Sequence, residues 1–419
     1  MSEEKNSQGK NQLKRTDAAE LYVEKLLSIP FFAEFVFRSP TKVVGGSEKE
    51  VADLLISLGS MSVLISQKCQ QDPDSRDQTK TESWARKQAK NAAAQLQGAL
   101  RTGSNRPAWC NHPRRGRVNF PNGLPAIGHG IVLIEVFQVV DLKTNAAELP
   151  LEYKDTPISY FSLNDFLNIA VELRTVPELL LYLEARRCLP PTDLRVIGDE
   201  KTLFEFYLLN DDSLNGCSNR TVATATIASQ QTELKQIVRE KKAMDVYSHL
   251  LEQVAHALAT RDDKFSSLPT EVQAYFEPLD RREGYLKMQA VIGDMRLPER
   301  ILLGQKFSRV MEMMNGSSNS QNMSFQASLL TSKPDWMFVF VSCISIDRAE
   351  LHRRMTELSI GALAYYDKSK CLLIADRAGE GFELALNQWT MPFTDAQRAL
   401  GRLLFGQLRM ESKEISLTR

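Results

Sequence analysis

The stretch VADLLISLGSMSVLISQK, residues 51–68, decides how the N-terminal part of the chain folds. It holds two short apolar runs on either side of Gly59-Ser60, a pattern that predicts a hairpin of buried β-strands. Each run carries one residue that is costly to bury, Asp53 in the first run and Lys68 at the end of the second. Because a carboxylate and an ammonium group are buried more readily together than alone, we expect these two side chains to meet.

The residues on either side of the hairpin extend it into an α/β domain, which we place at residues 16–150. A capped helix and a β-rich segment at residues 31–44 precede the hairpin. A polar loop follows, and then a helix at residues 84–101, whose alanine and leucine content gives it high helix propensity. An apolar stretch at residues 130–140 predicts a closing strand. The predicted order is helix, strands, hairpin, helix, strand.

The rest of the chain shows helical and mixed patterns that carry no chemical motif. Near the C-terminus, an apolar strand, a helix and a second strand at residues 335–377 predict a βαβ module. The helical regions are the expected surfaces for a homo-oligomer or a partner protein. The predicted parts are a disordered tail at residues 1–15, a mainly helical extension at residues 151–215, a helical region at residues 216–315 and a small α/β module at residues 323–419.

The composition is that of a globular protein. A chain of 419 residues is too long for one ordinary core and predicts two or three domains. Hydrophobic residues make up 43% of the chain and charged residues 25%, which disfavours both a disordered chain and a membrane protein. No apolar run is long enough for a bilayer span, and the first residues have no apolar signal core, so we expect a cytoplasmic protein. The six cysteines include no CxxC pair, so nothing indicates a structural zinc site.

Charge is distributed unevenly although the formal net charge is zero. Residues 83–134 contain no Asp or Glu, and this acid-free stretch carries many of the basic residues of the N-terminal part. A local excess of positive charge predicts contact with nucleic acid, with DNA as the expected partner, while a merely solvated face is the alternative. The predicted contacts with nucleic acid are Arg86, Lys87, Lys90, Arg114, Arg115 and Arg117.

An Asp on the first hairpin strand, a Lys near the end of the second, a polar loop and a basic helix together resemble the PD-(D/E)XK nuclease superfamily. The resemblance covers about residues 18–140 and implies a restriction-endonuclease-like fold within a mixed α+β class. It also implies Mg²⁺-dependent cleavage of DNA, in DNA processing or in bacterial defence against foreign DNA. The implied roles are Asp53 and Glu50 as metal ligands, Lys68 as the residue that orients the attacking water, and Gln95 as a supporting polar residue on the helix.

The sequence departs from this pattern two residues before Lys68, where the superfamily has an acidic residue and this chain has Ser66. A hydroxyl brings no charge to a metal site. Three replacements remain open: Glu50, an aspartate of the following loop at position 72 or 74, or an inward-turned Gln67. The first functional hypothesis is therefore a metal-dependent nuclease-like protein that acts on DNA. The second is a catalytically inactive nuclease-fold module that binds nucleic acid or a partner protein, and the third is an α/β protein unrelated to nucleases.

Overall fold

The chain folds into two compact units, residues 1–234 and residues 235–419, each with its own sheet and its own apolar core. The mixed α/β class predicted from the sequence is confirmed. Arg114, Asp72, Asp74 and residues 1–14 of the predicted tail lie outside the described residues. The computed structural model describes residues 15–31, 33–44, 46–70, 77–102, 106–113, 115–143, 149–260, 278–316 and 322–406.

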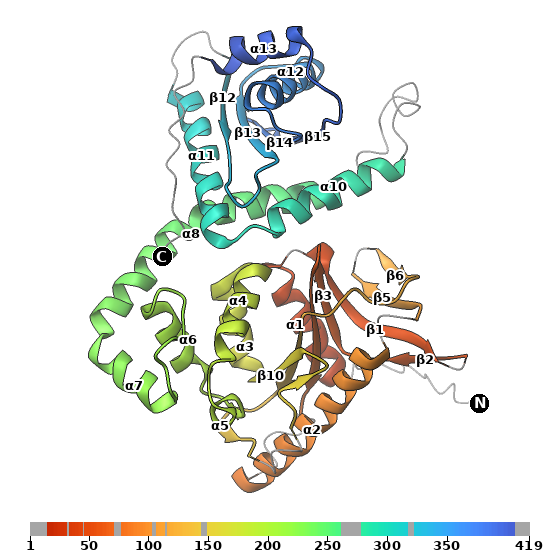
Figure 1. Ribbon diagram of the computed structural model, residues 1–419, viewed down its shortest axis with the longest axis vertical. Coiled ribbons are helices and arrows are strands. Elements are labelled where there is room, and N and C mark those ends of the chain that lie inside the picture. The colour runs from red at the N-terminus through yellow and green to blue at the C-terminus, as the bar shows by residue number, and fades with distance from the viewer. Residues whose placement is uncertain are drawn as a thin grey trace, which may run out of the picture. The chain divides into compact units, whose positions relative to one another are not determined.

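A large mixed sheet forms the centre of the first unit (Figure 1). Its strands are β1 (Val36–Val44), β2 (Ser47–Glu50), β3 (Leu54–Leu58), β4 (Met61–Lys68), β5 (Ala108–His112), β6 (Gly116–Phe120), β7 (His129–Ile134), β9 (Glu152–Tyr153) and β10 (Thr156–Ser162). They lie in the order β6-β5-β1-β3-β4-β7-β10-β9, and β2 pairs with β1. The strands β4, β7 and β10 run parallel to one another, whereas β1, β3 and β4 alternate in direction.

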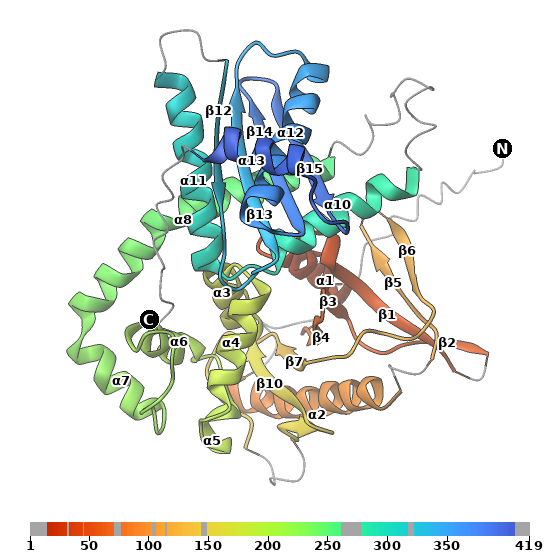
Figure 2. The ribbon, with the colours of Figure 1, turned by 45° about the horizontal axis from the view of Figure 1, so that its top comes forward.

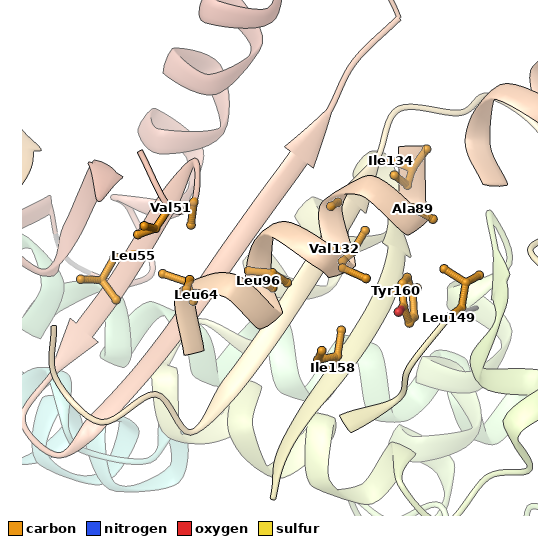
Figure 3. Close-up of a cluster of buried hydrophobic side chains, with 14 of the residues drawn as sticks. Val51, Leu55, Leu64, Ala89, Leu96, Val132, Ile134, Leu149, Ile158 and Tyr160 are labelled. Carbon is orange, nitrogen blue, oxygen red and sulfur yellow. The ribbon is translucent and has the colours of Figure 1, made fainter. Parts of the chain in front are cut away.

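The helix α2 (Gln78–Thr102) covers one face of this sheet, and α1 (Arg15–Leu27) and α3 (Leu163–Leu173) lie on the other, as Figure 2 shows. The buried side of α2 consists mainly of alanines, whose short side chains let the helix approach the strands closely. Figure 3 shows Leu96 of α2 next to Leu64 of β4 and Val132 of β7 in the buried cluster. The alanines of this cluster on α2 are Ala85, Ala89, Ala92, Ala93 and Ala99.

The predicted hairpin of β3 and β4 is present. Its strands pair from Leu54 opposite Ile65 to Leu58 opposite Met61, without a register shift. Gly59 in the turn has a φ of +60°, a backbone conformation that glycine adopts without steric cost. Because successive side chains of a strand point to opposite faces, this register places every second residue of β4 toward α2.

The acid-free stretch differs from the prediction because it contains an additional hairpin, β5 and β6, which pairs with the edge of β1. These strands are short and rich in polar residues, so they lack the apolar runs that reveal β3 and β4. The closing strand is also shorter than predicted and ends at Ile134. Ile134 pairs with Lys68 of β4 and with Ser162 of β10, and each partner is the last residue of its strand. The pairing of β7 with both neighbouring strands therefore ends at the same residue.

Helices follow the sheet in the first unit, together with two short strands, β8 (Val140–Asp141) and β11 (Val196–Ile197), that pair with each other. The helices after the sheet are α4 (Val176–Arg186), α5 (Pro191–Leu194), α6 (Glu200–Leu209) and α7 (Arg220–Ser229), and α8 (Gln231–Thr260) begins as the unit ends.

Among the described residues of both units, no helix is both apolar enough and long enough to cross a membrane.

The second unit contains a mixed sheet of β12 (Met323–Ser328), β13 (Trp336–Cys343), β14 (Lys370–Arg377) and β15 (Gly381–Gln388) in this order. The strands β13 and β14 are parallel and are joined by α12 (Arg348–Tyr366), so the predicted βαβ module is present. The strands β12 and β15 flank it and were not predicted. The remaining helices are α10 (Pro278–Gly293), α11 (Leu297–Gly316) and α13 (Asp395–Phe405).

Candidate functional site around Asp53

Asp53 is held in place by its own backbone immediately before β3. Its N–H donates to the carbonyl of Ile65 over 3.0 Å, and its carbonyl accepts from the N–H of Ser39 over 2.9 Å. These two bonds fix the residue between β1 and β4. Only 6% of Asp53 is exposed, so its carboxylate depends on protein donors for solvation.

Three donors from consecutive residues of β4 converge on a single oxygen, Oδ2 of Asp53. The hydroxyl of Ser66 lies 3.1 Å away, and the ammonium nitrogen of Lys68 lies 3.4 Å away. The backbone N–H of Gln67 is the third donor. The Lys68 side chain keeps 23% of its surface exposed, whereas Ser66 is fully buried.

Gln95 completes the cluster from α2. Its side-chain oxygen, Oε1, accepts from Nζ of Lys68 over 3.0 Å and lies 3.1 Å from the Ser66 hydroxyl. A hydroxyl has one proton, so Ser66 donates to either Asp53 or Gln95 at any one time. We call Asp53, Ser66, Lys68 and Gln95, with the backbone N–H of Gln67, the Asp53 cluster. It connects β3, β4 and α2.

The structure thus brings together Asp53, Lys68 and Gln95, the three residues predicted to be catalytic, whereas Glu50, the second predicted metal ligand, is exposed at the end of β2. Ser66 was expected only to weaken a metal site, but its hydroxyl connects Asp53 and Gln95 within the cluster. A signal for this role was present, because residues two apart on a strand share a face, and Ser66 lies two before Lys68. At the position where the resemblance led us to expect an acidic side chain, Ser66 therefore supplies a hydrogen-bond donor.

Of the three replacements considered for the expected acid, the structure describes Gln67 and Glu50. Gln67 points away from the cluster, because β4 keeps its register and Nε2 of this residue donates to Sγ of Cys69 over 3.1 Å. The inward-turned Gln67 is therefore wrong. Glu50 is exposed at the end of β2, opposite Thr41 of β1. Asp72 and Asp74 lie outside the described residues.

The described residues do not fit a magnesium site. Mg²⁺ requires near-octahedral oxygen coordination and is usually bound through one or two carboxylates. In the described part of the chain, no three His, Cys, Asp or Glu side chains gather into a group that could hold a metal ion. In the Asp53 cluster, Oδ2 of the one carboxylate already accepts from three donors, and Lys68 supplies the neutralising positive charge. The cluster holds a buried ion pair between Asp53 and Lys68, but it contains no second carboxylate that could bind a cation.

The predicted nucleic-acid contacts on α2 differ in their surroundings. Lys87 and Lys90 are exposed. Arg86 is partly buried, and its Nε donates to the carbonyl of Asp141 over 3.2 Å, while Nη2 lies 3.5 Å from Glu82. The guanidinium of Arg86 therefore connects α2 to β8, and part of it remains exposed to solvent.

The two described arginines of the β5–β6 hairpin also have protein partners. Nε of Arg115 lies 3.2 Å from Oε2 of Glu34, and the Arg115 side chain is only 15% exposed. Arg117 is half-exposed, lies 3.1 Å from Glu48 and covers the ring of Trp109 at 4.2 Å. Arg117 is therefore accessible to a ligand, whereas Arg115 mainly joins the hairpin to the rest of the sheet.

Comparison with protein-family models, with curated proteins and with solved structures finds no match to this chain.

Proposed function

We propose that this chain is a nucleic-acid-binding protein built on a nuclease-like scaffold, in which the Asp53 cluster joins secondary-structure elements and does not cleave. The observation that carries this proposal is the saturation of Oδ2 of Asp53 by Ser66, Gln67 and Lys68. A carboxylate in this state gives a stable internal contact. A hydrolytic metal centre would need further oxygen ligands beside this carboxylate, and the Asp53 cluster contains no second one.

The order of elements supports the scaffold. A helix, strands, the β3–β4 hairpin, α2 and β7 occur in the order that the resemblance to PD-(D/E)XK nucleases led us to expect. The side chains of Asp53 and Lys68 also point toward each other, which the resemblance requires. Ser66, in the place of the second acid, then accounts for a scaffold that keeps its geometry without its metal.

The charge distribution supports nucleic acid as the partner. The acid-free stretch, residues 83–134, includes most of α2 and the whole of β5, β6 and β7. Lys87, Lys90 and Arg117 present their charges to solvent there. Exposed cations in an acid-free region attract a phosphodiester backbone and release its counterions on binding.

The test is a paired assay of binding and cleavage. Purified protein is incubated with linear DNA, circular DNA and RNA, with Mg²⁺ or Mn²⁺, beside Asp53→Ala and Lys68→Ala variants. We expect binding that weakens steeply with salt and no cleavage by any of the three proteins. Cleavage by the unmodified protein that both substitutions abolish would overturn the inactive assignment, and absence of binding to all three nucleic acids would overturn the proposed partner.

A metal-dependent nuclease acting on DNA is the second candidate. The observation that favours it is the convergence of Lys68 and Gln95 on Asp53, the arrangement implied for the active enzymes. For this candidate to hold, a further oxygen ligand must come from outside the described residues, as Asp72 or Asp74 would. Substitution of both aspartates by asparagine should then abolish Mg²⁺-dependent cleavage.

A further inference from the structure

Basic residues converge where the β1–β2 hairpin meets the C-terminal end of α2. Lys42 of β1 lies opposite Lys49 of β2 on one side and opposite Ala108 of β5 on the other. Its ammonium nitrogen reaches across to α2 and donates to the carbonyl of Gly98 over 3.3 Å. The figures agree on this arrangement, with the hairpin beside one end of α2 in both views (Figures 1 and 2).

Two arginines extend this group. Arg101 is exposed in the last turn of α2, three residues after Gly98, and Arg106 is exposed two residues before Ala108. Lys49 is also exposed, whereas Lys42 has only 6% of its surface exposed. We call Lys42, Lys49, Arg101 and Arg106 the basic edge.

Acidic residues of the adjoining hairpin are directed elsewhere. Glu48 and Glu50 flank Lys49 on β2, so their side chains leave the strand on the opposite face from that of Lys49. Glu48 contacts Arg117 at 3.1 Å on that opposite face. The helix α2 has its one acidic residue, Glu82, in its N-terminal part, far along the helix from Gly98.

The group is electrostatically costly as it stands. Burial lowers the pKa of Lys42 below its ordinary value of 10.5, and the like charges of Lys49, Arg106 and Arg101 lower it further. Mutual repulsion of this kind disfavours the charged state of the folded protein and is relieved when an anion binds. Repulsion among these cations lowers the stability of the folded protein. A polyanionic ligand would explain why they are nevertheless gathered in one place.

We propose that the basic edge is the surface that holds the phosphodiester backbone of a nucleic acid. This inference rests on the proposed function and deepens it, since it identifies which of the basic residues make the phosphate contacts. Its exposed members come from three elements, β2, the end of α2 and the segment before β5, so they can contact successive phosphates of one strand.

The position of the basic edge relates it to the Asp53 cluster. The cluster contacts α2 at Gln95 and the basic edge contacts it at Gly98, and residues three apart on a helix are neighbours on its surface. The basic edge and the Asp53 cluster therefore contact α2 at positions within one helical turn of each other.

The experiment compares two triple variants that remove the same number of charges. The first is Lys49→Gln/Arg101→Gln/Arg106→Gln, which leaves the buried Lys42 intact so that folding is preserved. The matched control is Lys87→Gln/Lys90→Gln/Arg117→Gln, which removes exposed charges from the same unit away from the basic edge. Binding to a labelled DNA duplex and to the equivalent RNA is measured over a series of salt concentrations, after circular dichroism has verified folding.

We expect the first variant to lose affinity at least tenfold more than the control, and its salt slope to fall by about one for each phosphate contact removed. If the control loses as much affinity as the first variant, or more, the basic edge is not the phosphate surface, although the proposed function stands. If the unmodified protein binds neither nucleic acid, the proposed function and this inference both fail. Tighter binding to phosphatidylserine vesicles than to DNA or RNA would also overturn the inference.

Discussion

The ammonium nitrogen of Lys68 lies 3.4 Å from Oδ2 of Asp53, inside a cluster in which each charged group has further hydrogen-bond partners. The pair replaces two isolated buried charges by one neutral unit, which is what makes Asp53 tolerable at 6% exposure. The same relationship determines how the cluster should respond to substitution.

Ser66→Asp should make the stability of the first unit depend on divalent cations. The new carboxylate would face Asp53 across a distance now bridged by a 3.1 Å hydrogen bond, and two buried like charges repel each other. We expect a loss of about 3 kcal/mol in the free energy of unfolding without metal, and partial recovery with Mg²⁺ or Mn²⁺. Thermal unfolding with and without the cations measures the effect. Ser66→Asn is the uncharged control, and an equal response of both variants to Mg²⁺ would contradict the prediction.

Asp53→Asn and Lys68→Met should each destabilise the protein, and the double variant should lose less stability than the sum of the two single losses. Removing one partner leaves the other charge buried, which costs roughly 3–5 kcal/mol in a fully buried pair and less here, because Lys68 is 23% exposed. The double variant leaves no unpaired charge. Urea unfolding of the four proteins gives the coupling free energy, and strict additivity would show that the pair makes no net contribution.

Glu200→Gln should weaken a buried ionic network among the helices of the first unit. Glu200 accepts from Arg186 over 2.9 Å and from Tyr182 over 2.7 Å, and it also pairs with Arg220 at 3.3 Å. Neutralising it leaves the fully buried guanidinium of Arg186 without its carboxylate, and we expect a loss of roughly 3–5 kcal/mol. Chemical unfolding at neutral pH measures this loss, with the exposed Glu184→Gln as the control. A loss no greater than that of the control would contradict the prediction.

The same network should make stability fall in acid. Burial raises the pKa of Glu200, but Arg186 and Arg220 lower it by more, so that its net pKa lies below the ordinary value of 4.5. A carboxyl with a depressed pKa stabilises the folded state above the unfolded value, and this stability is lost as the pH falls through the folded pKa. The stability difference between the unmodified protein and Glu200→Gln should therefore shrink below pH 4.5. A difference that stays constant with pH would refute this linkage.

Lys42→Met should change the response to alkali. Because the pKa of Lys42 is lowered in the folded state, the unfolded chain holds this proton more firmly, and the free energy of unfolding rises with pH from that lowered pKa up to 10.5. The variant lacks this rise. Unfolding in urea at a series of pH values should show the unmodified protein gaining stability relative to the variant as the pH increases. A relative loss would mean that Lys42 is stabilised as a cation.

The sequence predicted the hairpin because its apolar runs and turn are local signals, and it predicted the meeting of Asp53 and Lys68 because neither charge is readily buried alone. Gln95 was predicted from the resemblance alone. The spacing of Ser66 and Lys68 indicates a shared face of the strand, but the partners of the Ser66 hydroxyl could not be predicted, since they depend on where the neighbouring helix lies. The hairpin of β5 and β6 was missed because its polar strands owe their conformation to pairing with β1.

The charged residues show a second limit of sequence reasoning. Arg115 was proposed to contact nucleic acid, yet the structure places it against Glu34, a residue distant in the chain. Lys42 lies in a β-rich run outside the acid-free stretch, so its place among basic residues depends on strand register and on the end of α2. A charge count along the chain detects the excess of cations but not the face on which they gather.

The alanines on the buried side of α2 have a consequence for how such a cluster can change over time. Their methyl groups set the gap between helix and sheet, and that gap brings the amide oxygen of Gln95 within 3.1 Å of the Ser66 hydroxyl. A larger residue at Ala92 would widen the gap and release Gln95 from β4 while leaving each member of the cluster intact. The geometry of the Asp53 cluster therefore depends on apolar positions. Evolutionary changes in that geometry should appear at these alanines as well as at Asp53 or Lys68.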